Sequence, residues 1–197
     1  MDENIGALKN TGFEIDLKGT LIHTRDFMWR MGVNLTHYKN VVTDLPLKDM
    51  PVTGVTRLKE GRSVYDFYLR EWAGVDPDNG DPLWYKNVKD EQGNITGRTT
   101  TNDYAQADYY YVDKSSLPKV YGGFNPAFSY KGFELSAIFA YSIGGYIVDR
   151  DVTMLWSNGS NPGRAWSTEI LKRWTPENRY TDVPALKTVS NNWNSNS

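Results

Sequence analysis

The stretch Tyr121–Gly145, YGGFNPAFSYKGFELSAIFAYSIGG, decides the fold. Its second half places Leu135 and Phe139 on one parity and polar residues on the other. A strand turns successive side chains to opposite faces, so this alternation separates an apolar face from a polar one. The turn at Lys131-Gly132 divides the stretch into two strands of about ten residues, which is long enough to cross a bilayer at a tilt. The stretch therefore predicts an antiparallel hairpin with one apolar face.

A second hairpin is predicted upstream, over residues 12–38. In its second strand, five apolar residues alternate with polar or small ones; the five are Phe27, Trp29, Met31, Val33 and Leu35. Such an unbroken two-residue period is the signature of a strand that is apolar on one face only. Together with the hairpin over residues 121–143, it predicts two ribbons of the same design.

The connections between strands differ sharply in length. A tight turn joins the two strands of each hairpin, whereas the segments 39–120 and 144–197 are long. In antiparallel order both long segments emerge at the same end of the sheet. Short turns on one rim and long extracellular loops on the other are typical of outer-membrane β-barrels.

The long segments contain structure of their own. Residues 64–73 and 83–88 alternate like strands, whereas the polar residues 99–108 are expected to form a mobile loop. Residues 166–174 predict a short helix, with Ser167 as its N-cap. Residues 147–156 fit either a continued strand or a helix.

Composition excludes several classes of protein. The net charge of −2 argues against a nucleic acid or an anionic membrane as an electrostatic partner. The absence of cysteine excludes disulfides and thiolate metal sites. No run of 18 apolar residues exists, so the sequence predicts no transmembrane helix. Aromatic residues make up 14% of the chain, an abundance that suits membrane interfaces, sugar-binding surfaces or an aromatic core.

Several stretches resemble the C-terminal region of the SusC/RagA family of TonB-dependent outer-membrane receptors from Bacteroidetes. They are Asn4-Ile5-Gly6 through Ile15, Gly74-Val75-Asp76-Pro77 through Leu83, Pro118 through Gly145, and Arg173-Trp174-Thr175-Pro176 through Pro184. The resemblance implies an all-β, antiparallel, partial transmembrane β-barrel of about four to six strands. It also implies long extracellular loops that hold one or two short helices.

The resemblance further implies what the parent protein does. Residues 1–197 would form an incomplete C-terminal part of a receptor barrel in the outer membrane of a Gram-negative bacterium, with the plug and the TonB-binding segment outside this sequence. The whole receptor would import a glycan or a peptide, together with a SusD-like surface lipoprotein and the TonB system. The expected surroundings are lipid and the nutrient ligand, with no cofactor and no metal, and the chain is not expected to be an enzyme.

A soluble envelope β-sandwich fits the same alternation. It would act as a carbohydrate- or protein-binding module, and its apolar faces would pack on each other about 10 Å apart. The two interpretations differ in what covers Trp29 and Phe139, which is either lipid or a second sheet.

The candidate ligand-binding residues are aromatic residues of the long segments: Trp72, Trp84, Tyr85, Trp156 and Trp166. Rings in loops need a partner, and a sugar, a peptide or a lid protein would provide one. Packing of the loops against each other explains the same rings. The run Tyr109-Tyr110-Tyr111 fits either an interfacial girdle or a loop anchor.

Catalytic and metal sites find little support in the sequence. The turn Asp76–Asp81 begins like a calcium-binding loop, but Pro77 and a positive φ at Gly80 explain it as an ordinary turn. The histidines, His23 and His37, fall at a turn and a strand end, which suits neither a zinc site nor a catalytic triad.

Overall fold

The computed structural model describes residues 6–47, 50–155, 163 and 165–187. The chain divides into two compact units. The first, here called the sheet unit, comprises Met1–Phe67 and Asp113–Ile147, and the second, the loop unit, comprises Tyr68–Val112 and Val148–Ser197. The chain passes from one unit to the other along the strands β3 (Asp66–Arg70) and β7 (Tyr109–Ser115).

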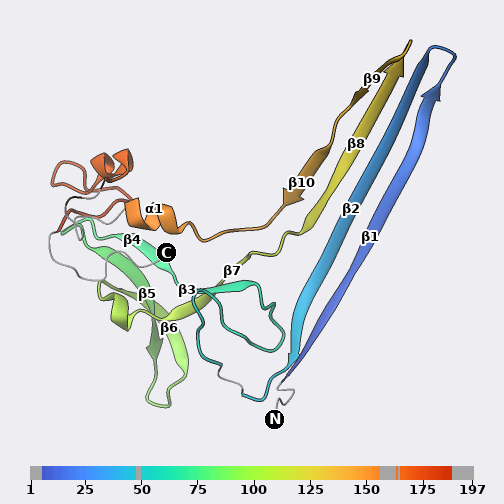
Figure 1. Cartoon of the computed structure of the whole chain (residues 1–197). Helices are drawn as coiled ribbons and strands as arrows, with labels where there is room; N and C mark the ends of the chain where they lie inside the picture. Colours follow the sequence, from blue (N-terminus) through green and yellow to red (C-terminus); the bar gives the residue numbers. More distant parts are fainter. Residues whose placement is uncertain (1–5, 48–49, 156–162, 164, 188–197) are drawn as a thin grey trace. The chain divides into compact units, whose positions relative to one another are not determined.

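The sheet unit is an open antiparallel sheet, and Figure 1 shows its long ribbons side by side with both tight turns at one end. Its strands are β1 (Ala7–His23), β2 (Phe27–Asp44), β8 (Val120–Tyr130), β9 (Phe133–Ser136) and β10 (Phe139–Ile143). The order is β1-β2-β8, and both β9 and β10 pair with the far edge of β8. This arrangement confirms the predicted all-β, antiparallel and unclosed barrel wall.

The strand register brings the apolar residues of every strand onto one face. Leu17 pairs with Val33, Val33 pairs with Phe124, and Phe124 pairs with Phe139. The rings of Phe124 and Phe139 stack with their centroids 4.4 Å apart. Because side chains alternate between the faces of a sheet, the neighbouring positions carry the polar residues to the opposite face. We call the two sides the apolar face and the polar face.

A single layer forms this wall. Among the described residues, the side chains of the apolar face stay open, with Leu17 exposed to 66% and Leu135 to 69%. A sandwich buries such residues between two sheets. The alternative prediction of a two-layer sandwich is therefore wrong.

Pro126 explains why the last ribbon is divided into β9 and β10. Both strands keep one register along β8, and the Ala137 amide donates to the Pro126 carbonyl at 3.1 Å. Proline has no N–H with which to return the bond, so the ladder breaks at this point. The strand predicted over residues 133–143 is thus one ribbon with a gap.

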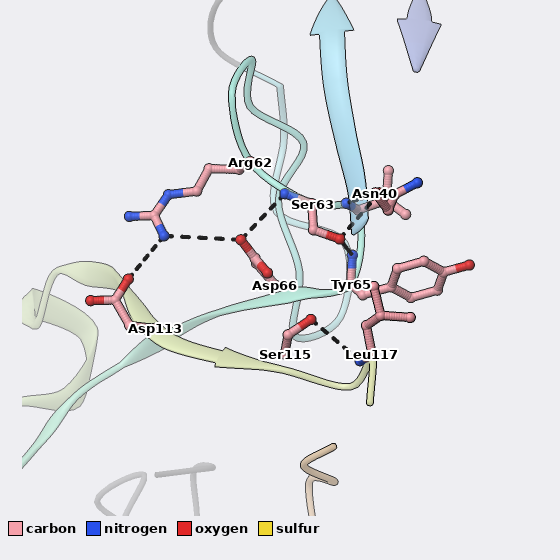
Figure 2. A network of polar contacts seen from close by, with 9 residues as sticks. Asn40, Arg62, Ser63, Tyr65, Asp66, Asp113, Ser115 and Leu117 are labelled. Atoms are coloured by element: carbon pink, nitrogen blue, oxygen red, sulfur yellow. Dashed lines mark hydrogen bonds and ion pairs between the residues drawn. The ribbon is translucent and has the colours of Figure 1, made fainter. Parts of the chain in front are cut away.

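The first hairpin is longer than the predicted range 12–38, because its strands run from Ala7 to Asp44. Beyond the apolar stretch, polar side chains hold the strands together and anchor the chain that follows. Asn40 is only 4% exposed, and its amide donates to the Asn10 Oδ1 atom at 2.7 Å. Its own oxygen accepts hydrogen bonds from the Ser63 hydroxyl at 3.1 Å and the Val64 amide at 3.0 Å. Figure 2 shows the contact between Asn40 and Ser63, which ties β2 to the segment after it.

We expect Asn40→Leu to loosen this anchor by about 2–3 kcal/mol, because it leaves the Ser63 hydroxyl and the Val64 amide without an acceptor. The measurement is hydrogen exchange at the Val64 amide. Asn10→Ala is the control, since it removes only the acceptor of the Asn40 side-chain amide and is expected to cost less than Asn40→Leu. Equal losses of protection in the two variants would show that burial of Asn40 is not what matters.

The loop unit is built around a three-stranded antiparallel sheet. It consists of β4 (Trp72–Val75), β5 (Pro82–Lys89) and β6 (Ile95–Thr101), in the order β4-β5-β6. Short helices complete it: η1 (Tyr104–Gln106), α1 (Arg150–Leu155) and η2 (Thr168–Lys172). The described residues include no helix with the length and hydropathy needed to cross a membrane.

These elements confirm some predictions and correct one. Strands form within the predicted ranges 64–73 and 83–88, and η2 begins at the predicted N-cap Ser167, whose hydroxyl accepts from the Glu169 amide at 3.3 Å. The range 99–108 is not simply a loop, because Thr99 pairs with Lys86 and Thr101 with Trp84. Threonine is a good strand former once a partner strand is present, which local polarity alone does not reveal.

Candidate functional site

Trp84 is the centre of the loop unit and not part of its surface. It is only 1% exposed, and Trp72 and Tyr104 contact it edge-on with ring centroids 5.8 Å and 5.1 Å away. A fully buried ring cannot stack on a ligand. The prediction of a ligand-binding role is therefore wrong for Trp84, and loop packing explains it.

Tyr85, the next residue of β5, contacts a different set of residues. The Arg98 guanidinium lies 4.1 Å from the ring centroid of Tyr85 and 4.1 Å from that of Tyr110. Arg98 also forms an ion pair with Glu71 at 2.5 Å. A planar cation between two aromatic faces, held by a carboxylate, combines charge and stacking in one contact.

Ionisation follows from the same contacts. The hydrogen bond that Arg98 donates to the Glu71 carboxylate raises the pKa of Arg98, which therefore stays charged. Burial is the main cause that raises the pKa of the Tyr110 hydroxyl, which donates to the Asn87 Oδ1 atom at 2.9 Å. Tyr110 is thus a neutral donor at ordinary pH. The sequence pointed to Tyr85 but gave no sign of Arg98, which lies on another strand.

Replacing Arg98 by glutamine is expected to destabilise the loop unit by about 1–2 kcal/mol, because both the ion pair and the stacking are lost. Arg98→Lys keeps the charge without the flat guanidinium. Its stability is expected to lie between those of the wild type and the glutamine variant. The check is the midpoint of thermal unfolding of the protein, followed by tyrosine and tryptophan fluorescence. If the lysine variant unfolded at the same temperature as the glutamine variant, the stabilisation would come from the planar guanidinium and not from the charge.

The tyrosine run in β7 anchors the loop unit. Tyr68 stacks on Tyr109 with ring centroids 5.5 Å apart and lies 4.7 Å from the ring of Tyr111. Arg70 lies over Tyr109, 4.6 Å from its ring centroid. Of the two interpretations that the sequence left open, the structure supports the loop anchor.

The remaining predicted aromatics have different surroundings. Trp72 and Trp166 are half-buried, and the Trp166 Nε1 atom is buried with no hydrogen-bond partner in the described part of the chain. Trp156 lies outside the described residues. A ligand-binding role for Trp72, Tyr85 and Trp166 stays a prediction.

The turn Asp76–Asp81 is closed by its own side chains. The Asp76 carboxylate accepts from the Asp78 amide at 2.9 Å and from the Asn79 side-chain amide at 3.0 Å. Gly80 has φ +74, as predicted for this position. Hydrogen bonds that an aspartate accepts from groups two and three residues ahead are a common way to fix a tight turn.

A distant segment, residues 174–187, closes over this turn, and we call the assembly the clasp. The Trp174 Nε1 atom donates to the Pro77 carbonyl at 3.1 Å, and the Arg179 Nε atom donates to the same oxygen at 2.7 Å. Arg179 also pairs with Asp78, and Lys187 pairs with Asp81. The clasp therefore joins segments about one hundred residues apart.

The contacts of the clasp bear on whether this turn could bind calcium. Asp78 and Asp81 already face cationic side chains, and Asp76 is occupied by amides. Among the described residues, no group of three His, Asp or Glu side chains has the arrangement of a metal site. These contacts favour the interpretation of an ordinary turn.

Comparison with known proteins explains why a wall and an elaborate loop unit occur in one chain. No protein-family model matches the chain. A TonB-dependent receptor of Formosa agariphila is 28% identical over 195 residues, which cover 92% of this chain and 19% of that receptor. The TonB-dependent receptor SusC of Bacteroides thetaiotaomicron is 28% identical over 161 residues, 75% of this chain and 15% of SusC.

Solved structures agree with these relatives. The structure of the RagAB peptide transporter superposes with a TM-score of 0.80 at 32% identity, over 93% of this chain and 20% of that one. The RagAB peptide importer in its closed-closed state gives a TM-score of 0.79 at 32% identity. The chain belongs to the SusC/RagA family of TonB-dependent receptors.

The SusC/RagA chain spans about a fifth of the length of the relatives it matches. Agreement with RagAB extends over 93% of its residues, so it covers both the wall and the loop unit. The relatives are named as receptors and the solved neighbours as transporters, in line with the expectation that this SusC/RagA protein is not an enzyme.

Proposed function

We propose that this chain forms part of the wall and the extracellular mouth of a receptor in the outer membrane of a Gram-negative bacterium. The receptor imports a nutrient, a glycan or a peptide, together with a SusD-like surface lipoprotein. The TonB system supplies the energy through parts of the receptor outside residues 1–197. The open apolar face of the sheet unit is the observation that carries this proposal.

The height of that face fits a bilayer. On β2 the apolar parity runs from Phe27 to Leu35 and changes at His37 and Lys39. Nine residues at about 3.4 Å each span about 30 Å along the strand. A strand tilt of about 40° reduces this to about 23 Å, close to the apolar band of about 25 Å in outer-membrane barrels.

The polar face fits a water-filled lumen. It carries Glu14, Asp16 and Lys18 on β1 and Arg30 on β2. The Thr36 hydroxyl donates to the Glu14 carboxylate at 3.3 Å, and Lys18 pairs with Asp16 at 3.1 Å. Charged side chains are costly in contact with lipid but are tolerated in a hydrated interior, so the face that carries them fits the lumen.

Spin labels test the membrane assignment. Cysteine variants at Leu17 and Leu135 place labels on the apolar face of the full-length receptor in liposomes, and Ser136→Cys places the control on the polar face. We expect molecular oxygen, which concentrates in lipid, to relax the first two labels more than a water-soluble nickel complex does, with the reverse at the control. Labels at Leu17 and Leu135 that respond mainly to the nickel complex would exclude lipid contact and end the proposal.

In the loop unit, Trp72, Tyr85 and Trp166 are the proposed ligand contacts, and Trp156 belongs to the same proposal. A ring with one free face stacks on a sugar or packs against a peptide. The peptide class is supported by the similarity to RagAB, which is a peptide transporter, whereas the glycan class comes from the family resemblance alone.

Uptake experiments separate the two nutrient classes. Cells that carry Trp72→Ala or Trp166→Ala receptors are compared with the wild type for growth on peptides or on glycans as sole carbon source. We expect a several-fold loss on one class only. Leu171→Ala is the control, since this side chain is 73% exposed and not aromatic. Equal growth of all strains would remove these rings from the ligand site while leaving the wall assignment intact.

A further inference from the structure

We propose that Lys9 and Lys39, on the apolar side of the wall, bind the phosphate of an anionic lipid headgroup. The site lies just beyond the apolar band at the end of the sheet that carries the long loops. This inference rests on the proposed function, because it requires the apolar face to meet lipid.

The two faces of the wall carry different charged residues. The carboxylates Glu14, Asp16 and Glu134 fall on the polar face. Up to the pair Leu8–Val42, the charged residues of the apolar side in the first hairpin are Lys9 and Lys39. Beyond that pair the register shifts, and Asp44 lies opposite Ala7, on the side of Lys9. Two cations just beyond the apolar band match a surface rich in anionic headgroups.

The register places these lysines next to each other. Lys39 pairs with Thr11, and Lys9 lies two positions farther along β1, opposite Val41. Diagonal neighbours of this kind have Cα atoms about 7–8 Å apart. A phosphate between two such ammonium groups is within reach of both, because each lysine can donate three hydrogen bonds.

Neither lysine is engaged within the chain. Both are exposed, and across the described ranges neither forms an ion pair or a side-chain hydrogen bond. Two like charges at this spacing repel each other until an anion lies between them. The free ammonium groups therefore favour an anionic ligand.

The height of Lys39 above the apolar band also fits the position of the lipid headgroups. Lys39 lies four residues beyond Leu35, the last apolar residue of the band on β2. Four residues rise about 13 Å along the strand, or about 10 Å along the membrane normal at a tilt of about 40°. The headgroup layer occupies about the first 5–8 Å beyond the hydrocarbon, and a lysine can reach back along its own stem.

His37 marks the boundary between the band and the lysines. Its ring lies against Phe13 with centroids 5.5 Å apart, and its Nδ1 atom lies 2.5 Å from the Lys119 carbonyl oxygen. His37 is therefore engaged with the chain, which leaves the lysines as the groups available to lipid.

The test uses the full-length receptor in nanodiscs of phosphatidylcholine with 30 mol% phosphatidylglycerol as the anionic probe. Lipids that stay bound after mild delipidation are identified by native mass spectrometry. We expect the wild type to retain phosphatidylglycerol, and Lys9→Gln/Lys39→Gln to lose about tenfold or more of it, since each lysine near an anionic surface adds about 1 kcal/mol. The matched control is Lys18→Gln, which removes a lysine of β1 from the polar face and should retain the lipid.

The same nanodiscs carry the labels at Leu17 and Leu135, so the two proposals fail differently. Equal phosphatidylglycerol retention in the wild type and the double variant, with both labels in lipid, overturns the headgroup site and leaves the receptor wall intact. Labels that remain outside lipid overturn both. Loss of lipid from the Lys18→Gln variant as well would show a general charge effect and would also refute the site.

Discussion

Gly80→Ala is expected to open the clasp and to lower hydrogen-exchange protection of the Ala185 amide about a hundredfold. A Cβ atom at this position would lie 2.6 Å from the Trp174 ring and 2.7 Å from the Ala185 Cβ atom. The backbone φ of +74 adds strain for any residue with a side chain. Overpacking and strain together cost about 3 kcal/mol, which corresponds to a factor of about one hundred.

The readout is direct because the Ala185 amide donates to the Gly80 carbonyl at 3.0 Å. Gly97→Ala is the matched control, since a Cβ there meets nothing within 4 Å and Gly97 has no positive φ. We expect Gly97→Ala to change protection by less than threefold. If Gly80→Ala kept the Ala185 amide as protected as in the wild type, the clasp would not depend on the close contact with Trp174.

Leu17→Arg is expected to destabilise the receptor in a bilayer by about 2–4 kcal/mol, the cost of a guanidinium near the midplane of a barrel's lipid face. Leu17 is 66% exposed and lies in the middle of the apolar face, opposite Val33. The measurement is the urea midpoint of the full-length receptor in phosphatidylcholine liposomes. In water an exposed arginine at this position would cost little stability. A large destabilisation by Leu17→Arg therefore shows that this face contacts lipid.

The control for Leu17→Arg places the same side chain on the other face. Ser129→Arg adds a guanidinium on the polar face, where Ser129 pairs with Glu134. We expect a change below about 1 kcal/mol, because an exposed ion pair contributes little. Equal destabilisation by both arginines would mean that the two faces meet the same medium, which contradicts the receptor wall.

The sequence predicts the parts of this chain that depend on local rules. Alternation alone identifies both hairpins of the wall, and a positive φ at Gly80 follows from the turn chemistry around it. Ser167 is recognisable as a helix cap from its position. In each case neighbours within a few residues decide the conformation, so the signal is present in a short window.

Predictions for the loop unit fail where partners come from far away. Residues 99–101 are polar and look like a loop, yet they complete a strand because β5 is available to pair with them. The sequence does not reveal Arg98 as the cation between Tyr85 and Tyr110 either. Such contacts depend on which strands become neighbours, and no local pattern encodes that.

By itself, the sequence determined antiparallel hairpins with one apolar face, because side-chain alternation is a property of each strand alone. Only the tertiary structure decided that Trp84 is core and that the clasp holds the Asp76–Asp81 turn with Trp174 and Arg179. In the sequence, an aromatic or charged residue looks the same whether its side chain is buried, paired or free. Its surroundings, set by residues on other strands and loops, decide which of these it is.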